Sequence, residues 1–157
     1  MDSLKEKSIV FEYDLNLKHE EISMRNKIYI TNNAPLSQQE QCCIIDVGKS
    51  ISEVYMINSK NFLKEAKFDS FTYFRRIIEK NITELITRIV FFNIGILLEK
   101  EFELDVTKFL LEFAKDFQVF VIKGAFKIVD GNKLIWNVEK PNNKIEFNQG
   151  VIEVVSE

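Results

Sequence analysis

The fold of this chain is decided near its middle, by Arg88-Ile-Val-Phe-Phe-Asn-Ile-Gly-Ile-Leu-Leu98. From Ile89 onward this stretch is almost wholly apolar, so we expect a strand whose two faces are both buried. Strands of this kind lie in parallel sheets that helices cover on both sides. The stretch therefore predicts an α/β fold with a mainly parallel sheet.

Helical and strand patterns flank this stretch. Large apolar residues recur at three- and four-residue steps over residues 70–86, with Asp69 or Ser70 as the helix N-cap, and again from Val106 to Phe117 after Asp105. β-Type runs cover residues 27–31, 42–47, 54–57 and 117–122, and residues 8–15 form either a further strand or a short helical lead-in. This order predicts right-handed crossovers in one domain that spans residues 1–157.

The C-terminal part predicts antiparallel strands. Residues 125–129 and 133–138 flank Asp130-Gly131, a turn that favours a β-hairpin. Residues 144–147 and 151–155 predict a final pair of strands around Gln149-Gly150. We therefore expect a hairpin at the edge of the parallel sheet.

Composition limits the classes of function. The formal net charge is −3 and 46% of the residues are hydrophobic, so the chain has no overall basic field that would attract nucleic acid or an anionic membrane. The first residues do not form a signal peptide, and we expect a cytoplasmic protein with no membrane partner. We expect the adjacent Cys42 and Cys43 to be reduced thiols on opposite faces of a strand.

Gly48-Lys49-Ser50 is the one segment that looks like a phosphate-binding loop. The full pattern needs a glycine where Cys43 stands, and a helix after the serine. Only Ile51 to Glu53 separate Ser50 from the strand predicted at 54–57, which leaves no room for that helix. We therefore keep Gly48, Lys49 and Ser50 as an alternative cofactor site only, for ATP or GTP with magnesium.

Charged residues form two further candidate sites. Glu99, Glu101, Glu103 and Asp105 follow the apolar strand, and they either bind a metal or exchange a proton, or form a solvated loop with a helix cap. Basic residues at 75, 76, 80 and 88 form either a basic strip or a solvated helix face. His19 lies in a polar segment and is expected at the surface.

Partner binding has its own candidate residues. They are Arg75, Arg76, Lys80 and Trp136. Trp136 is either an interface anchor or a side chain that fills the C-terminal hairpin.

Four segments carry a family resemblance: Ile89–Leu98, Leu104–Leu111, Gln118–Ile122 and Gly131–Trp136. Their order and spacing, mainly over residues 88–147, resemble BrxF, the small P-loop protein of the bacterial BREX phage-exclusion systems. The resemblance implies a P-loop-like fold. It also shows two losses, because acidic residues of the BrxF pattern are replaced here by Phe92 and Gly95, and no glycine-lysine loop follows Lys27–Ile30.

Together these features predict a protein without catalytic or metal-binding residues and without a cofactor. The leading hypothesis is a non-catalytic P-loop-like scaffold or adaptor subunit of a bacterial multiprotein complex, with phage-defence subunits as the partners that the resemblance implies. One alternative is a nucleotide-binding NTPase with an atypical phosphate loop. A second alternative is an accessory nucleic-acid-binding protein.

Overall fold

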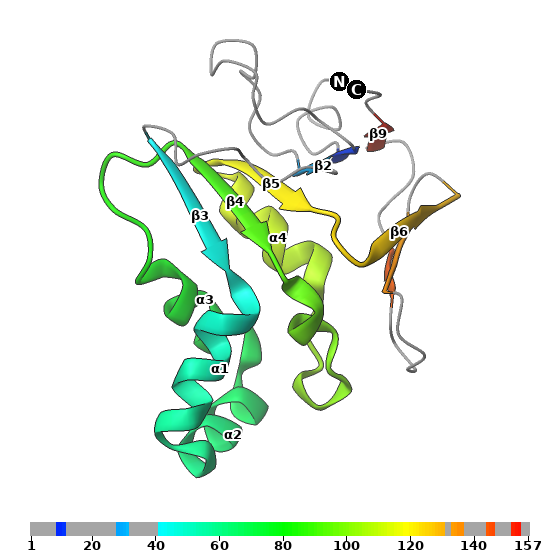
Figure 1. Cartoon of the computed structure of the whole chain (residues 1–157). Helices are drawn as coiled ribbons and strands as arrows, with labels where there is room; N and C mark the ends of the chain where they lie inside the picture. Colours follow the sequence, from blue (N-terminus) through cyan, green and yellow to red (C-terminus); the bar gives the residue numbers. More distant parts are fainter. Residues whose placement is uncertain are drawn as a thin grey trace.

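The computed structural model describes residues 9–11, 28–31, 41–130, 133–136, 144–146 and 152–154. A parallel sheet has the strand order β3-β4-β5-β2-β1-β9, and a smaller antiparallel sheet has the order β6-β7-β8 (Figure 1). The parallel strands are β1 (Ile9–Phe11), β2 (Ile28–Thr31), β3 (Cys42–Asp46), β4 (Arg88–Phe92), β5 (Gln118–Ile122) and β9 (Ile152–Val154). The antiparallel strands are β6 (Phe126–Val129), β7 (Lys133–Trp136) and β8 (Lys144–Glu146).

Four α-helices join the strands: α1 (Val47–Ile57), α2 (Ser59–Phe68), α3 (Ser70–Glu79) and α4 (Val106–Ala114). Two short 3-10 helices, η3 (Ile94–Leu98) and η4 (Lys100–Phe102), lie between β4 and α4. In Figure 1, α1 to α3 gather beyond the carboxyl end of β3, and α4 lies behind the strands. The expected mixed α/β architecture with a parallel sheet is confirmed.

The strand β4 is buried on both faces, as its apolar sequence predicts. It pairs in parallel with β3 on one side and β5 on the other, so that Ile45, Phe91 and Val121 form a row across the sheet. This row belongs to the main core, whereas Val90 belongs to a cluster on the opposite face with Tyr29, Cys42 and Phe120.

The described helices pack on one face of the sheet, which corrects the expectation of helices on both faces. Buried residues of α1 to α4 all join the core cluster that contains Ile89 and Phe91. The second cluster contains residues of β2, β3, β4 and β5 but none from the described helices. The apolar sequence of β4 thus predicts correctly that both faces of the strand are buried. It does not predict which elements cover each face.

The strand predicted at residues 54–57 is wrong, because these residues end helix α1. Asp46 caps this helix by accepting a hydrogen bond from the Lys49 amide at 2.9 Å. Val47, Ile51 and Val54 then follow at helical spacing and pack against the core. The capped start and this apolar stripe outweigh the β-propensity of the local sequence.

Helix α2 was not foreseen, and α3 is shorter than the pattern over 70–86 suggests. Asn58 caps α2, and its buried residues Phe62 and Ala66 are one turn apart. After α3, Asn81 donates both its amide N–H and its side-chain Nδ2 to the carbonyl of Ile78. This local bonding competes with further helix, so the apolar residues at 82 and 86 pack from a loop instead.

The end of β4 and the C-terminal strands also differ from expectation. The strand stops at Phe92, where Asn93 adopts a left-handed conformation with φ of 56° and turns the chain into η3. The antiparallel pairing of β6 with β7 confirms the predicted hairpin. Its predicted place at the edge of the parallel sheet is wrong, because β6 and β7 pair with β8 in a separate sheet. The predicted pairing of the last two segments is wrong, because β8 pairs with β7 while β9 pairs with β1.

Aromatic rings fill much of the core between the helices. Phe74 is fully buried, and its ring contacts those of Phe62 at 6.0 Å and Phe102 at 4.9 Å between centroids. Leu134 and Ile145 of the smaller sheet are buried in the same cluster. Among the described helices, none has the length and apolarity that crossing a bilayer requires.

Replacing Phe74 with alanine is expected to lower the free energy of unfolding by about 3–5 kcal/mol, because it removes a fully buried ring and leaves a cavity. Chemical denaturation followed by circular dichroism measures this change. Phe68→Ala is the matched control, since that ring is exposed and its loss is expected to change stability by about 0.5 kcal/mol or less. Equal effects of the two substitutions would contradict the core described here.

Candidate functional site

The carboxyl edge of the parallel sheet is the first place to look for a site, because ligands of open α/β sheets bind beyond the carboxyl ends of the strands. At this edge β3 continues directly into α1, and β4 continues through Asn93 into η3. The two junctions meet at Asp46, Gly48 and Asn93. We call these three residues the β3–β4 corner.

Hydrogen bonds hold the β3–β4 corner together. The Gly48 amide donates to the Asn93 carbonyl at 3.1 Å, and Asn93 Nδ2 donates to Asp46 Oδ1 at 3.0 Å. A Cβ atom at Gly48 would clash with the Asn93 side-chain amide. Glycine is therefore required by a close approach of side chain to backbone, and the space above it is filled by the protein itself.

Gly48, Lys49 and Ser50 lie in the first turn of α1, at the end of a parallel strand. The prediction that no helix follows Ser50 is wrong, since α1 continues to Ile57. However, the Lys49 amide already donates to Asp46 Oδ1. A phosphate at this helix N-terminus would be repelled by the Asp46 carboxylate, which already accepts the hydrogen bond of the Lys49 amide.

A cavity of about 260 Å³ lies beside the corner, at the carboxyl ends of β4 and β5. Its lining residues are Phe92, Asn93, Ile94, Ile122, Lys123, Gly124, Ala125 and Phe126. The described residues of this lining include an amide and an ammonium group but no carboxylate. Phe92 thus supplies no acid at the end of β4, while residues 32–40, which follow β2, lie outside the described residues.

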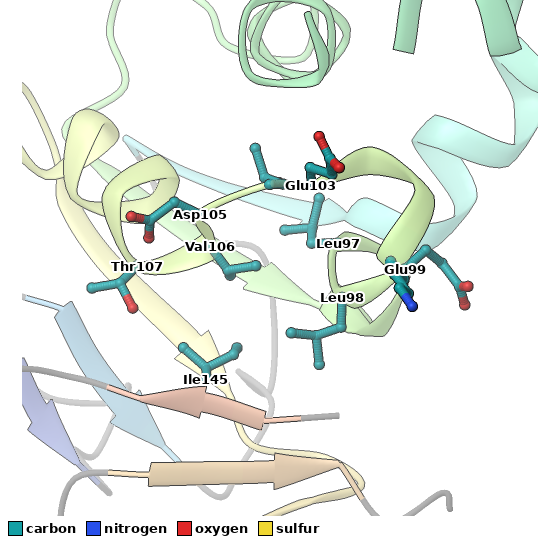
Figure 2. A pocket seen from close by; sticks show the side chains of 10 residues that line it. Leu97, Leu98, Glu99, Glu103, Asp105, Val106, Thr107 and Ile145 are labelled. Atoms are coloured by element: carbon teal, nitrogen blue, oxygen red, sulfur yellow. The ribbon is translucent and has the colours of Figure 1, made fainter. Parts of the chain in front are cut away.

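Three of the four acidic candidates after β4, at positions 99, 103 and 105, line a second cavity, of about 460 Å³, whereas Glu101 is exposed outside it. Its lining residues are Leu97, Leu98, Glu99, Lys100, Glu103, Leu104, Asp105, Val106, Thr107 and Ile145, which together we call the acid-rimmed pocket. In Figure 2, Leu98, Val106 and Ile145 face its interior, while the carboxylates of Glu99, Glu103 and Asp105 point in different directions.

The divergence of these carboxylates bears on metal binding. Asp105 Oδ1 accepts a hydrogen bond from the Lys108 amide at 3.1 Å, which confirms the helix-cap assignment. Within the described ranges, no three His, Cys, Asp or Glu side chains are grouped so that they could hold a metal ion.

The basic residues do not form one strip. Arg88 is completely buried, with its guanidinium 5.0 Å from the centre of the Phe120 ring, which corrects its assignment to an exposed face. Arg75 joins two helices, because Nε lies 3.1 Å from Glu79 Oε2 and Nη1 lies 3.4 Å from Glu112 Oε1. A hydrogen bond from Lys115, with the nearby positive charges, lowers the pKa of Glu112.

The remaining candidates occupy separate places. Arg76 and Lys80 are exposed on or just after α3. Trp136 ends β7, where it pairs with Phe126. Their roles in partner binding stay predictions, and His19 lies outside the described residues. Cys42 and Cys43 are buried thiols that form no disulfide and lie on opposite faces of the sheet, and burial raises the pKa of each.

Sequence reasoning missed an exposed surface on the helices α1 and α2. Met56, Ile57 and Phe68 are 81%, 84% and 87% exposed, respectively. Three exposed lysines, Lys60, Lys64 and Lys67, lie on α2 between them. These six residues form what we call the lobe surface. The spacing of the lysines at four and three residues was a usable signal, but it needs a helix at 59–68 to be recognised.

No family model, no curated protein and no solved structure matches the chain. The resemblance to BrxF therefore stays a prediction.

The β3–β4 corner can be tested by mutation. Gly48→Ala is expected to lower the free energy of unfolding by about 1–3 kcal/mol, because the new methyl group overpacks against Asn93. Asn93→Gly removes that side chain and suits the left-handed backbone, so the double variant is expected to recover part of the loss.

A double-mutant cycle measured by chemical denaturation gives the coupling between the two positions. Independent, additive effects would show that Asn93 does not fill the space above Gly48.

Proposed function

We propose that this chain is a non-catalytic, P-loop-like scaffold or adaptor subunit of a bacterial multiprotein complex, and that it docks partners through the lobe surface. Phage defence is the setting that its likeness to BrxF suggests. The observation that carries the proposal is the exposure of Met56, Ile57 and Phe68, three large apolar side chains on neighbouring helices. Exposed large apolar side chains of this kind are typical of binding surfaces.

Two features at the sheet edge support a role without catalysis. The β3–β4 corner fills the space above Gly48 with the Asn93 side chain. The cavity at the ends of β4 and β5 has no carboxylate among the described residues that line it, so these residues lack the acids that hold magnesium and orient a water in phosphoryl transfer. A parallel sheet that has kept its core while losing these groups fits a protein that acts through its surface.

The three lysines of the lobe surface suggest what kind of partner fits. Lys60, Lys64 and Lys67 lie on α2, between Ile57 and Phe68 in the sequence, and add positive charge to this helix, although the chain as a whole carries −3. A partner surface that combines apolar with acidic side chains would match this composition. Arg76 and Lys80 are further candidates for the same contact, whereas Arg75 is already paired within the chain.

The triple variant Met56→Ser, Ile57→Ser, Phe68→Ser is expected to lose partner proteins while remaining folded, because all three side chains are exposed. A tagged chain is expressed in the cells from which the sequence comes, and co-purified proteins are quantified by mass spectrometry. Untagged copies of the chain itself are scored separately from other proteins.

Leu85→Ser provides the matched control, since Leu85 is 77% exposed but lies in the loop after α3. The control is expected to retain every protein that the wild type retains. If the triple variant retains the same proteins in the same amounts, the docking role of the lobe surface is wrong.

Nucleotide binding is a second candidate function, favoured by one observation. Gly48-Lys49-Ser50 opens a helix directly after a parallel strand, which is where a phosphate loop would stand. The Asp46 carboxylate at that helix start opposes it.

We therefore expect neither ATP nor GTP, each with magnesium, to raise the melting temperature of the wild type. A ligand at 100 times its dissociation constant would add about 2.7 kcal/mol of stability, which a thermal-shift assay detects readily. A clear increase that is lost in Lys49→Ala, but kept in the exposed-lysine control Lys64→Ala, would establish the nucleotide-binding alternative instead.

A further inference from the structure

Helix α2 presents its positive charge and one large ring on the same side. Lys60, Lys64, Lys67 and Phe68 stand at positions i, i+4, i+7 and i+8, which share one face of an α-helix. Phe62 and Ala66 lie on the opposite face and are buried in the core. The outward face of α2 therefore carries an aromatic side chain next to a row of cations.

The acid-rimmed pocket has the complementary character. Leu97, Val106 and Ile145 are buried side chains in its wall. Among the described lining residues, Glu99, Glu103 and Asp105 add three carboxylates, and Lys100 adds one ammonium group. Its volume of about 460 Å³ is within the range of about 300–1,000 Å³ that is usual for binding pockets. An apolar side chain flanked by cations would suit this pocket.

None of the described residues that line this pocket is aromatic. Helix α2 contacts η4, so the two surfaces belong to neighbouring parts of the molecule. Even so, Phe68 is 87% exposed and is absent from the pocket lining. Among the described residues, therefore, the ring of Phe68 and this pocket do not meet within one molecule.

We infer that the lobe surface of one copy docks into the acid-rimmed pocket of a second copy. This inference rests on the proposed function, because it names the partner of the same lobe surface. Phe68 enters the apolar interior as the anchor, and the lysines of α2 face Glu99 and Glu103. Aromatic anchors and complementary charges are the usual source of specificity in such contacts.

The contact joins two different surfaces. Two copies can therefore exchange lobes reciprocally in a symmetric pair, or follow one another head to tail. In either case the association is expected to weaken with added salt, because the lysines and Glu103 are exposed to solvent.

A charge-swap experiment tests the inference on the full-length protein by analytical ultracentrifugation. One variant carries Lys60→Glu, Lys64→Glu and Lys67→Glu, and the other carries Glu99→Lys and Glu103→Lys. Asp105 is left unchanged because it caps α4.

Each variant alone is expected to raise the dissociation constant for self-association by more than about tenfold, since like charges then face each other; a tenfold change corresponds to about 1.4 kcal/mol. An equal mixture of the two variants is expected to associate again, because every lobe then meets a pocket of opposite charge. Restored association also shows that both variants are folded.

Single substitutions provide a second measurement that does not alter charge. Phe68→Ser is expected to weaken self-association by about tenfold or more, as for the loss of an interface anchor. Leu85→Ser, which removes an apolar side chain of similar exposure elsewhere, is expected to leave it unchanged.

Several outcomes would overturn the inference. A wild type that stays monomeric at all concentrations does so, as does a mixture that fails to associate when the wild type does. If the wild type is monomeric but co-purifies with a different protein that the triple serine variant at Met56, Ile57 and Phe68 does not retain, the adaptor function stands and only the self-docking is wrong. If the monomeric wild type instead sediments with anionic vesicles and the Lys60, Lys64 and Lys67 variant does not, the lobe surface binds a membrane and the self-docking is wrong.

Discussion

Burial of β4 on both faces is the constraint on which the described structure depends. Ile89 and Phe91 point to the helices, while Val90 points to the other face, so β4 needs a neighbouring strand on each side and cover above and below. The crossover from β3 through α1, α2 and α3 and the crossover through α4 both return to this face. Because the aromatic side chains of α2, α3 and η4 meet there, the lobe that carries the exposed residues is held firmly to the sheet.

The same crossovers determine what the carboxyl edge of the sheet can do. In this edge the side chain of Asn93 covers Gly48, and the carboxylate of Asp46 binds both the Lys49 amide and the Asn93 amide. The hydrogen bonds from Gly48 to Asn93 and from Asn93 to Asp46 therefore join the end of β3 to the end of β4. They stabilise the junction of these two strands with α1 and η3.

The sequence predicts some parts of this structure well and others poorly, for identifiable reasons. Apolar runs at 28–31, 42–46, 88–92 and 118–122 are strands because burial on two faces leaves a continuous signal. Asp105 and Asp69 are recognisable caps because each is followed by an amphipathic helix. The segment 54–57 misled, since its β-branched residues continue a helix whose start, at Asp46, is visible only through a side-chain hydrogen bond.

The candidate surfaces were harder to foresee for a related reason. The position of a residue in the sequence does not reveal which groups it contacts. Arg75 is paired with Glu112 of another helix, and Arg88 is buried on the sheet next to the Phe120 ring. Neither fact follows from their nearness in sequence to Arg76. Exposure of Phe68 depends in turn on where α2 ends, which the local sequence does not specify.

The net charge of −3 also conceals an uneven distribution. Lys60, Lys64 and Lys67 concentrate positive charge on α2, while Glu99, Glu103 and Asp105 concentrate negative charge around one pocket. The lysine charges and the carboxylate charges cancel in the net charge of the chain. Salt at moderate concentration screens charges over about 10 Å, so an approaching molecule meets the local charge of one surface and not the net charge. A scaffold needs such local contrast more than it needs net charge, because orientation between partners is set by where opposite charges can meet.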